Sequence, residues 1–320
     1  MSASAATTGN PPRLFFQPQL GLALQGGGAY GAFAWGVLDR LLDERDFRPV
    51  AISGASAGAL NAAALAAGLV SGGRRGAKAA LADLWTRVAE MPYLRLLGAP
   101  GANLQMDLMT RLLSPYQFNP LNINPLRELL VRLIDFDALR DHSEVALLLS
   151  ATNVRTGMPR IFRETEITVE VLLASACMPY LHQAVEIEGE SYWDGGFSAN
   201  PPLLPLALDT ACRSLLVVKL NPDVEDEVPV HAQAIFARMR RVLFNTPLRC
   251  DLDALTGMQA QLRHTARLPR DLQRLREMRV DTITLPGDML NSDRAELAPI
   301  QLIARLHHAG RDAAEALLDA

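Results

Sequence analysis

Residues 50–61 read Val-Ala-Ile-Ser-Gly-Ala-Ser-Ala-Gly-Ala-Leu-Asn and predict a strand that turns sharply into a helix. Within them, Gly54-Ala55-Ser56-Ala57-Gly58 matches G-x-S-x-G, the pattern of a tight strand-to-helix turn that exposes a serine hydroxyl. Small residues also pack helices closely, so the pattern alone leaves a packing role open. The stretch predicts Ser56 as a candidate nucleophile at a helix N-terminus, where free N–H groups can hold an oxyanion.

A second glycine-rich turn precedes this one. Residues 19–25 form an apolar run typical of a buried strand, and Gly26-Gly27-Gly28-Ala29-Tyr30-Gly31 follows at once. Residues 32–45 then carry apolar side chains at helical spacing. Strand, helix and strand in this order predict a βαβ unit, with parallel strands and a right-handed crossover.

This glycine turn fits two functions. The spacing Gly26-x-Gly28-x-x-Gly31 is also a dinucleotide-binding fingerprint, which would suit an oxidoreductase. That fingerprint needs an acidic residue at the end of the second strand, whereas here the chain runs from Ile52 into the serine turn. The dinucleotide alternative therefore lacks half of its signature. Backbone N–H groups in the turn can equally stabilise an oxyanion beside Ser56.

Composition indicates a globular chain that is not a nucleic-acid binder. The 320 residues are 49% hydrophobic and 21% charged, and the formal net charge is -4. The three widely spaced cysteines, Cys177, Cys212 and Cys250, fit reduced buried thiols of a cytoplasmic protein better than a disulfide or zinc framework. No charge occurs between Arg48 and Arg74, but the strand, turn and helix predicted there argue against a membrane span.

Four segments describe the expected organisation. Residues 1–18 are predicted to be a disordered leader without a secretion signal, and residues 19–220 a catalytic domain. An irregular insertion at 91–134 is typical of a lid or substrate-binding loop, with a small satellite core as the alternative. Residues 221–320 are predicted to form a mainly helical extension packed on the same domain. Further strands are expected at 145–151, 160–163, 184–187, 192–193, 214–220 and 282–285.

The extension is rich in arginine. Between Arg238 and Arg279 there are ten arginines and only four acidic residues. One interpretation is a solvated helical face with internal ion pairs. The other is a patch that rests on anionic lipid headgroups, so peripheral membrane contact through residues 238–279, or through the apolar insertion at 91–125, is considered.

An activated serine usually has a histidine partner oriented by a carboxylate. None of the six histidines lies in a glycine-rich turn or at a strand end: His142, His182, His231, His264, His307 and His308. Asp194 is more suggestive, because it follows Tyr192-Trp193 and precedes Gly195-Gly196. An ordinary Asp-Gly turn is its simpler explanation. A triad of Ser56, Asp194 and a histidine remains an alternative.

Three turns together resemble, in order and spacing, the three signature motifs of the patatin-like phospholipase family. They are residues 26–31, residues 54–58 and Asp194-Gly195-Gly196. Other segments are similar to those of bacterial members: 35–39, 150–153, 174–179 and 192–196. The resemblance covers residues 20–220 and matches the last hundred residues only loosely.

The resemblance implies a three-layer α/β/α fold with a mainly parallel central sheet and a Ser–Asp dyad without histidine. Ser56 is then the nucleophile and Asp194 the base. The backbone N–H groups assigned to the oxyanion hole are those of Gly26, Gly27 and Gly28, helped by Ala57. The supporting motif glycines are Gly31, Gly54, Gly58, Gly195 and Gly196. No cofactor or metal is implied.

The expected reaction is hydrolysis of carboxylic esters of phospholipids or lysophospholipids through an acyl-enzyme. A carboxylesterase for short or neutral esters and a non-catalytic lipid-binding module are the alternatives. The expected location is cytoplasmic, with peripheral contact at the inner membrane surface. One residue departs from the family pattern: Tyr30 stands where arginine or lysine is common. Without a basic residue at this position, it is open how the glycine turn is anchored and which substrate charge is preferred.

Overall fold

The computed structural model describes residues 19–91, 113–225, 228–291 and 298–319. The predicted leader, residues 1–18, lies outside the described residues, as do residues 92–112 of the insertion predicted at 91–134. The described part of that insertion contains two helices, α5 (Pro115–Phe118) and α6 (Pro125–Leu133).

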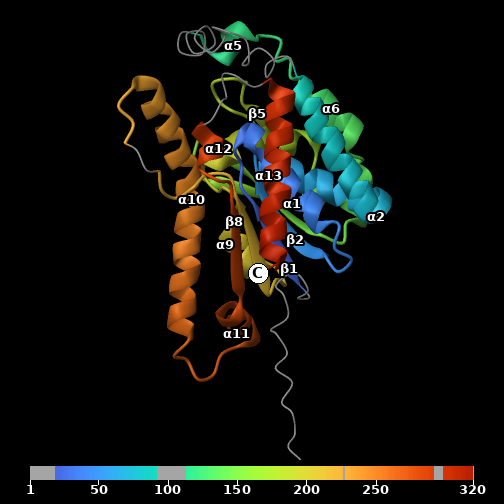
Figure 1. The fold of residues 1–320 in the computed structure, drawn as a ribbon. Coiled ribbons are helices and arrows are strands. Elements are labelled where there is room, and N and C mark those ends of the chain that lie inside the picture. The colour runs from blue at the N-terminus through green and yellow to red at the C-terminus, as the bar shows by residue number, and fades with distance from the viewer. Residues whose placement is uncertain (1–18, 92–112, 226–227, 292–297, 320) are drawn as a thin grey trace, which may run out of the picture.

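The centre of the molecule is one mixed sheet with the strand order β5-β6-β3-β2-β1-β7-β8 (Figure 1). Its parallel strands are β1 (Leu20–Leu24), β2 (Pro49–Ala55), β3 (Ala146–Asn153), β7 (Ser214–Lys219) and β8 (Arg279–Thr284). Three further strands run antiparallel to their neighbours: β4 (Pro159–Arg163), β5 (Val185–Ile187) and β6 (Glu190–Asp194). The central strands β1 and β7 are buried along their whole length, because helices cover both faces of the sheet.

Alternate side chains of the sheet enter two different cores. Leu22 and Leu24 of β1 pack in one apolar cluster, whereas Ala23, between them, packs in the other. The first cluster includes α1 (Gly31–Leu41), α2 (Ala57–Glu90) and α13 (Pro299–Asp319). The second includes α9 (Leu203–Asp209), α10 (Ala232–Leu262) and α11 (Arg270–Glu277). Figure 1 shows these helix sets on opposite sides of the sheet, which confirms the predicted three-layer fold.

The chain beyond residue 220 builds part of both outer layers and one strand of the sheet. The predicted strand at 282–285 begins earlier than expected, since β8 spans Arg279–Thr284 and pairs with β7. Helix α13 then lies along α1. The helical C-terminal extension is therefore continuous with the layers that hold the motifs.

Other helices differ from the sequence expectations. α7 (Phe136–His142) was not predicted; Asp135 caps it by accepting a hydrogen bond from the Ala138 N–H at 3.0 Å. The long α2 contains non-helical backbone at Gly72 and Gly73, where two helices meet. The remaining helices are α8 (Val169–Ser175) and α12 (Asp288–Asn291).

The cysteine prediction holds for two of the three side chains. All three are free thiols, and Cys177 and Cys212 are buried, but Cys250 is exposed on α10. Within the described residues, no helix combines the length and the apolarity needed to cross a bilayer.

Candidate active site

Ser56 lies alone between the end of β2 at Ala55 and the start of α2 at Ala57. Its backbone has a φ of 53° and a ψ of −124°, a conformation that is strained for any residue with a side chain. The turn is so tight that a Cβ atom on Gly58 would overlap the Leu24 carbonyl oxygen. The second glycine of the motif is therefore required by close packing against the end of β1.

The glycine turn at 26–31 packs directly against this serine. A Cβ atom on Gly26 would lie 2.8 Å from the Ser56 Cβ atom and 2.6 Å from the Ala55 carbonyl oxygen. Gly28 has a φ of +60°, which favours glycine. Among the described residues, none accepts a hydrogen bond from the backbone N–H groups of Gly27, Gly28 or Ala57. Three free donors are thus present on the two turns that flank Ser56.

The Gly26 N–H group is occupied, in contrast to the other donors assigned to the oxyanion hole. It donates to the Asn200 Oδ1 atom at 2.7 Å. The Asn200 Nδ2 atom in turn donates to the Phe244 carbonyl oxygen of α10, also at 2.7 Å. Gln25 is held similarly, because its Nε2 atom donates to the Asn245 Oδ1 atom at 3.1 Å. A buried amide network therefore ties the glycine turn to α10.

Asp194 ends β6 and is fully buried. Its Oδ1 atom accepts a hydrogen bond from the Gly196 N–H at 2.8 Å. Its Oδ2 atom is buried without a hydrogen-bond partner of ordinary geometry among the described residues. Burial raises the pKa of Asp194 to about 7, while the Ser56 side chain and the Gly196 N–H group lower it. The Ser56 side chain is therefore one of the groups that influence this carboxyl group.

The two glycines after Asp194 make room for its neighbours. A Cβ atom on Gly195 would overlap the Ser150 carbonyl oxygen, and one on Gly196 would overlap the Phe244 ring. Thr152 of β3 also holds this turn, because its Oγ1 atom donates to the Asp194 carbonyl oxygen at 2.7 Å. The Asp-Gly-Gly segment is a closely packed turn at the end of a strand.

Three polar residues of the site were not predicted from the sequence as site residues. Ser175 accepts a hydrogen bond from the Ser56 N–H at 3.0 Å through its Oγ atom, and so fixes the strained serine from α8. Asn200 and Asn245 hold the glycine turn and the residue before it. Ser175 lies in the 174–179 segment that resembles the family, but no pattern around Asn200 or Asn245 indicated contact with the glycine turn.

Tyr30 anchors the glycine turn in place of a basic residue. Its side chain is buried, and its hydroxyl group donates to the Leu290 carbonyl oxygen of α12 at 3.4 Å. The Tyr30 hydroxyl group therefore anchors this turn to the C-terminal part of the chain.

No histidine joins the site in the described part of the chain. None forms a hydrogen bond or an ion pair with Ser56 or Asp194, and none is among the groups that shift the pKa of Asp194. His307, for example, stacks on Trp35 at a ring-centroid distance of 3.8 Å and lies 3.3 Å from Asp39. Nor do the described residues hold three His, Cys, Asp or Glu side chains placed to bind a metal ion.

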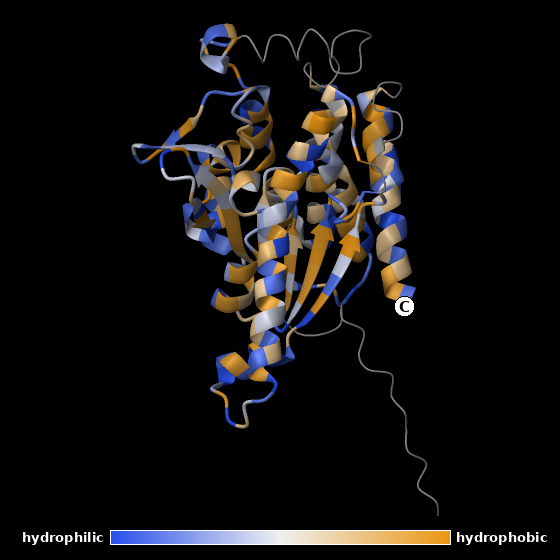
Figure 2. Ribbon diagram, turned by 90° about the vertical axis from the view of Figure 1, so that its left-hand side faces the viewer, coloured by the Kyte–Doolittle hydropathy of each residue, from blue (hydrophilic) through white to orange (hydrophobic). Residues whose placement is uncertain are grey.

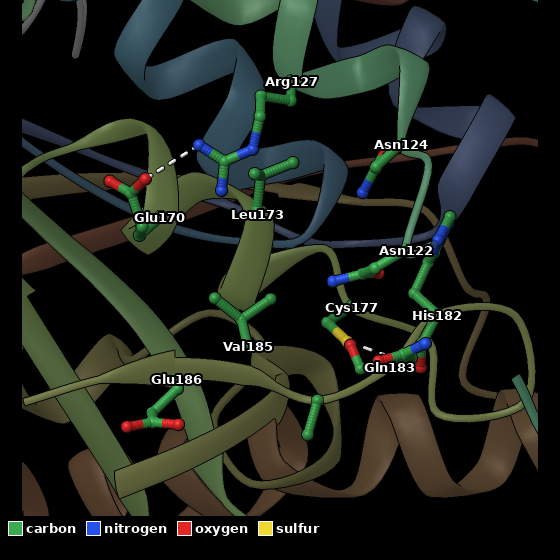
Figure 3. Close-up of a pocket in the computed structure, with 11 residues that line it drawn as sticks. Asn122, Asn124, Arg127, Glu170, Leu173, Cys177, His182, Gln183, Val185 and Glu186 are labelled. Atoms are coloured by element: carbon green, nitrogen blue, oxygen red, sulfur yellow. Dashed lines mark hydrogen bonds and ion pairs between the residues drawn. The ribbon is translucent and has the colours of Figure 1, made fainter. Parts of the chain in front are cut away.

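A cavity of about 220 Å³ lies next to the site, between α6, α8 and β5 (Figure 3). The Arg127–Glu170 ion pair, 2.8 Å long, crosses its rim, and Cys177 lies at its wall. Burial and the charge of Asp194 raise the pKa of the Cys177 thiol to about 12, which makes it a poor nucleophile. Neither Ser56 nor Asp194 lines this cavity.

Replacing Asn200 by alanine should lower kcat for a soluble ester by about ten- to a hundredfold with a smaller change in KM, because the glycine turn loses its alignment. Stability should also fall, since the Gly26 N–H and the Phe244 carbonyl are left unpaired. Steady-state kinetics and chemical denaturation measure both effects.

The matched control is Gln259→Ala, which deletes two partly buried hydrogen bonds, 3.0 and 2.8 Å long, to the Leu275 and Met278 carbonyl oxygens, without touching the glycine turn. It should cost stability while kcat stays near that of the parent chain. Equal losses of kcat in the two variants would contradict the proposed role of Asn200 in positioning the glycine turn.

Comparison with known proteins gives a match to one protein family. The family model described as patatin-like phospholipase matches residues 22–207, more than half of the chain. Among solved structures, the crystal structure of VipD from Legionella pneumophila is similar with a TM-score of 0.49 and 17% sequence identity. That alignment covers 94% of this chain and 67% of the other. No match is found among curated proteins.

Proposed function

Because this chain belongs to the patatin-like phospholipase family, we propose that it is a serine hydrolase of lipid esters that works through a Ser56–Asp194 dyad. The observation that carries the proposal is the buried Asp194 carboxyl group, whose pKa of about 7 is influenced by the Ser56 side chain. A general base with a pKa near neutrality is suited to accept a proton at physiological pH. The strained turn presents its proton donor, Ser56.

The first half-reaction forms an acyl-enzyme. The Ser56 Oγ atom attacks the ester carbonyl carbon, and its proton passes to the Asp194 carboxylate. The carbonyl oxygen becomes an oxyanion, which the free N–H groups of Gly27, Gly28 and Ala57 stabilise. When the tetrahedral intermediate collapses, the C–O bond to the alcohol breaks, and Asp194 returns the proton to the departing alcohol oxygen.

The second half-reaction restores the enzyme. Asp194 takes a proton from a water molecule, whose oxygen attacks the acyl carbonyl carbon. The Ser56–acyl bond breaks, the Ser56 oxygen regains a proton from Asp194, and the carboxylic acid leaves. The Gly26 N–H is excluded from the oxyanion hole in this proposal, because Asn200 already accepts its hydrogen bond. Its role is to hold the loop.

Three features favour the dyad over the alternatives. The described residues place no histidine in contact with Ser56 or Asp194, which disfavours a Ser-Asp-His triad. β2 runs from Pro49 to Ala55 without a carboxylate for ribose hydroxyls, so a dinucleotide-binding oxidoreductase lacks its second element. Lipid binding without catalysis does not require a strained serine or a buried carboxyl group with a pKa of about 7, which disfavours a non-catalytic lipid-binding module.

A parallel hydrolysis assay tests the substrate class. Phospholipid, lysophospholipid, triacylglycerol and a short p-nitrophenyl ester are offered to the parent chain at equal molarity. We expect release of free fatty acid from phospholipid or lysophospholipid at the higher rates, and covalent labelling of Ser56 by a fluorophosphonate probe. Hydrolysis of the short ester alone would reassign the chain as a short-chain carboxylesterase. No hydrolysis and no labelling would contradict the proposal.

A further inference from the structure

An apolar stripe faces solvent on the first turns of α10, a helix outside the region that the family model matches. Its members are each at least 40% exposed: Ile235, Phe236, Met239, Val242 and Leu243. Successive helical residues are rotated by about 100°, so these spacings place all five on one side of the helix. Exposed apolar groups in such a continuous arrangement are typical of interaction surfaces.

The opposite side of the same helix supports the candidate active site. Phe244 and Asn245 are buried there. The Phe244 carbonyl accepts the hydrogen bond from Asn200, and Asn245 accepts the one from Gln25. The stripe is therefore on the outer face of a helix whose inner face holds the glycine turn. Whatever binds the stripe is brought next to the site.

A second apolar group lies at the same end of the molecule, on and after α5. Tyr116, Leu121 and Ile123 are 58%, 80% and 64% exposed. Figures 1 and 2 both show α5 and the first turns of α10 beyond the carboxyl ends of the parallel strands, where β2 leads into Ser56. Of the seventeen exposed large apolar side chains among the described residues, twelve fall within 113–123 and 224–243. We call these twelve side chains the apolar rim.

The charges on the rim indicate which kind of surface it fits. Arg238 and Arg241 of α10 both bind Glu225, at 2.9 and 2.6 Å. Residues 221–225 and 228–243 contain two acidic residues and three arginines, so the described α10 side of the rim is close to neutral. Of the other seven arginines between Arg238 and Arg279, three lie on α11, at the opposite end of the molecule (Figure 1). Charge complementarity therefore favours a zwitterionic lipid surface over an anionic one.

We propose that the apolar rim docks this chain on a zwitterionic lipid surface, with the Ser56 end of the sheet turned toward the lipid. The proposal rests on the proposed function, since lipid esters are held in such surfaces. Exposed aromatic and aliphatic side chains on a helix bind interfaces by burying apolar area among the acyl chains. This proposal differs from the interpretation of residues 238–279 as an anionic-lipid patch in the lipid charge that it requires.

Vesicle flotation tests the proposal on the Ser56→Ala chain, so that lipid is not consumed. The chain that carries Ser56→Ala alone, which is the parent in this experiment, should float with phosphatidylcholine vesicles. Adding phosphatidylserine to the vesicles should leave its partition coefficient nearly unchanged. The double variant Met239→Ser/Leu243→Ser should bind at least about tenfold more weakly, because two exposed apolar side chains are lost. The matched control, Leu208→Ser/Leu272→Ser, removes two exposed leucines from α9 and α11 and should bind like the parent.

Several outcomes would overturn the proposal. One is equal binding of the rim variant and the control, and another is binding to phosphatidylserine-containing vesicles alone. A third is a parent chain that elutes as a dimer and becomes a monomer in the rim variant, which would assign the surface to a second copy.

Hydrolysis of a soluble ester separates this proposal from the proposed function. With Ser56 restored, the rim variant should hydrolyse p-nitrophenyl acetate as fast as the parent. If neither hydrolyses it, the proposed function fails, whereas the vesicle experiment still decides whether the rim binds lipid.

Discussion

Replacing Ser56 by alanine is expected to lower ester turnover by about 10⁴-fold or more, because no other side chain can form the acyl-enzyme. Fluorophosphonate labelling should be lost with it. The alanine chain keeps the strained φ of 53°, so its thermal unfolding should stay close to that of the parent. Turnover of a soluble ester, covalent labelling and thermal unfolding measure the three effects.

Ser56→Gly is the matched variant that separates chemistry from strain. It should be as inactive as the alanine variant and more stable than it, by about 1 kcal/mol, since glycine adopts a positive φ without cost. Residual turnover above about one percent in either variant, in a folded chain, would exclude Ser56 as the nucleophile. A glycine variant less stable than the alanine variant would show that the turn stores no strain.

Replacing Asp194 by asparagine is expected to lower turnover by about 10³- to 10⁴-fold, because the amide cannot accept the Ser56 proton. Asparagine is close in shape and can still accept the Gly196 hydrogen bond, so the fold should be kept. In the parent chain, kcat should rise with pH and level off above a midpoint of about 7, where Asp194 is ionised. The asparagine variant should show no such midpoint.

Stability provides an independent test of the same carboxyl group. Burial raises the pKa of Asp194 from 3.8 in the unfolded chain to about 7 in the folded one. The folded state therefore binds more protons between these values, and the contribution of Asp194 to stability falls as pH rises from about 4 to about 7. Relative to the parent, Asp194→Asn should gain stability on going from pH 4 to pH 8. Each pKa unit between the folded and unfolded states corresponds to about 1.4 kcal/mol of this gain.

Denaturant unfolding at pH 4 and pH 8 measures that gain. Asp223→Asn is a suitable control. Burial raises the pKa of its partly exposed carboxyl group, but the hydrogen bonds from Lys219 and Asn245, together with the charges of Lys219 and Arg249, lower it further. Its replacement should change stability with pH in the opposite direction. A parent and an Asp194→Asn variant with the same pH dependence would place the titrating base elsewhere.

Much of the fold could be predicted from local sequence. The apolar runs at 19–25, 145–151 and 214–220 predict buried strands because helices cover both faces of a parallel sheet, and the structure has β1, β3 and β7 there. α7 was missed because its seven residues are mostly polar and its helix depends on the Asp135 cap. The start of β8 was missed because Arg279 and Asp281 are polar. These residues adopt the strand conformation because they pair with β7.

The candidate site divides in the same way. Local sequence is enough to place Ser56 on a strand-to-helix turn, since the Gly54 and Gly58 spacing is a requirement of a tight bend. It is also enough to show that glycine turns precede Ser56 and follow Asp194. Such motifs are recognisable because each is a property of a few adjacent residues.

Which of these groups meet depends on tertiary contacts. The fold packs the Gly26 turn against Ser56, buries Asp194 until its pKa is about 7, and occupies the Gly26 N–H with Asn200. It also brings α10, which is far along the chain, against the glycine turn and the Asp194 turn. The apolar stripe of α10 faces outward. These facts depend on distances between residues remote in sequence and on desolvation by the whole fold, which no local pattern encodes.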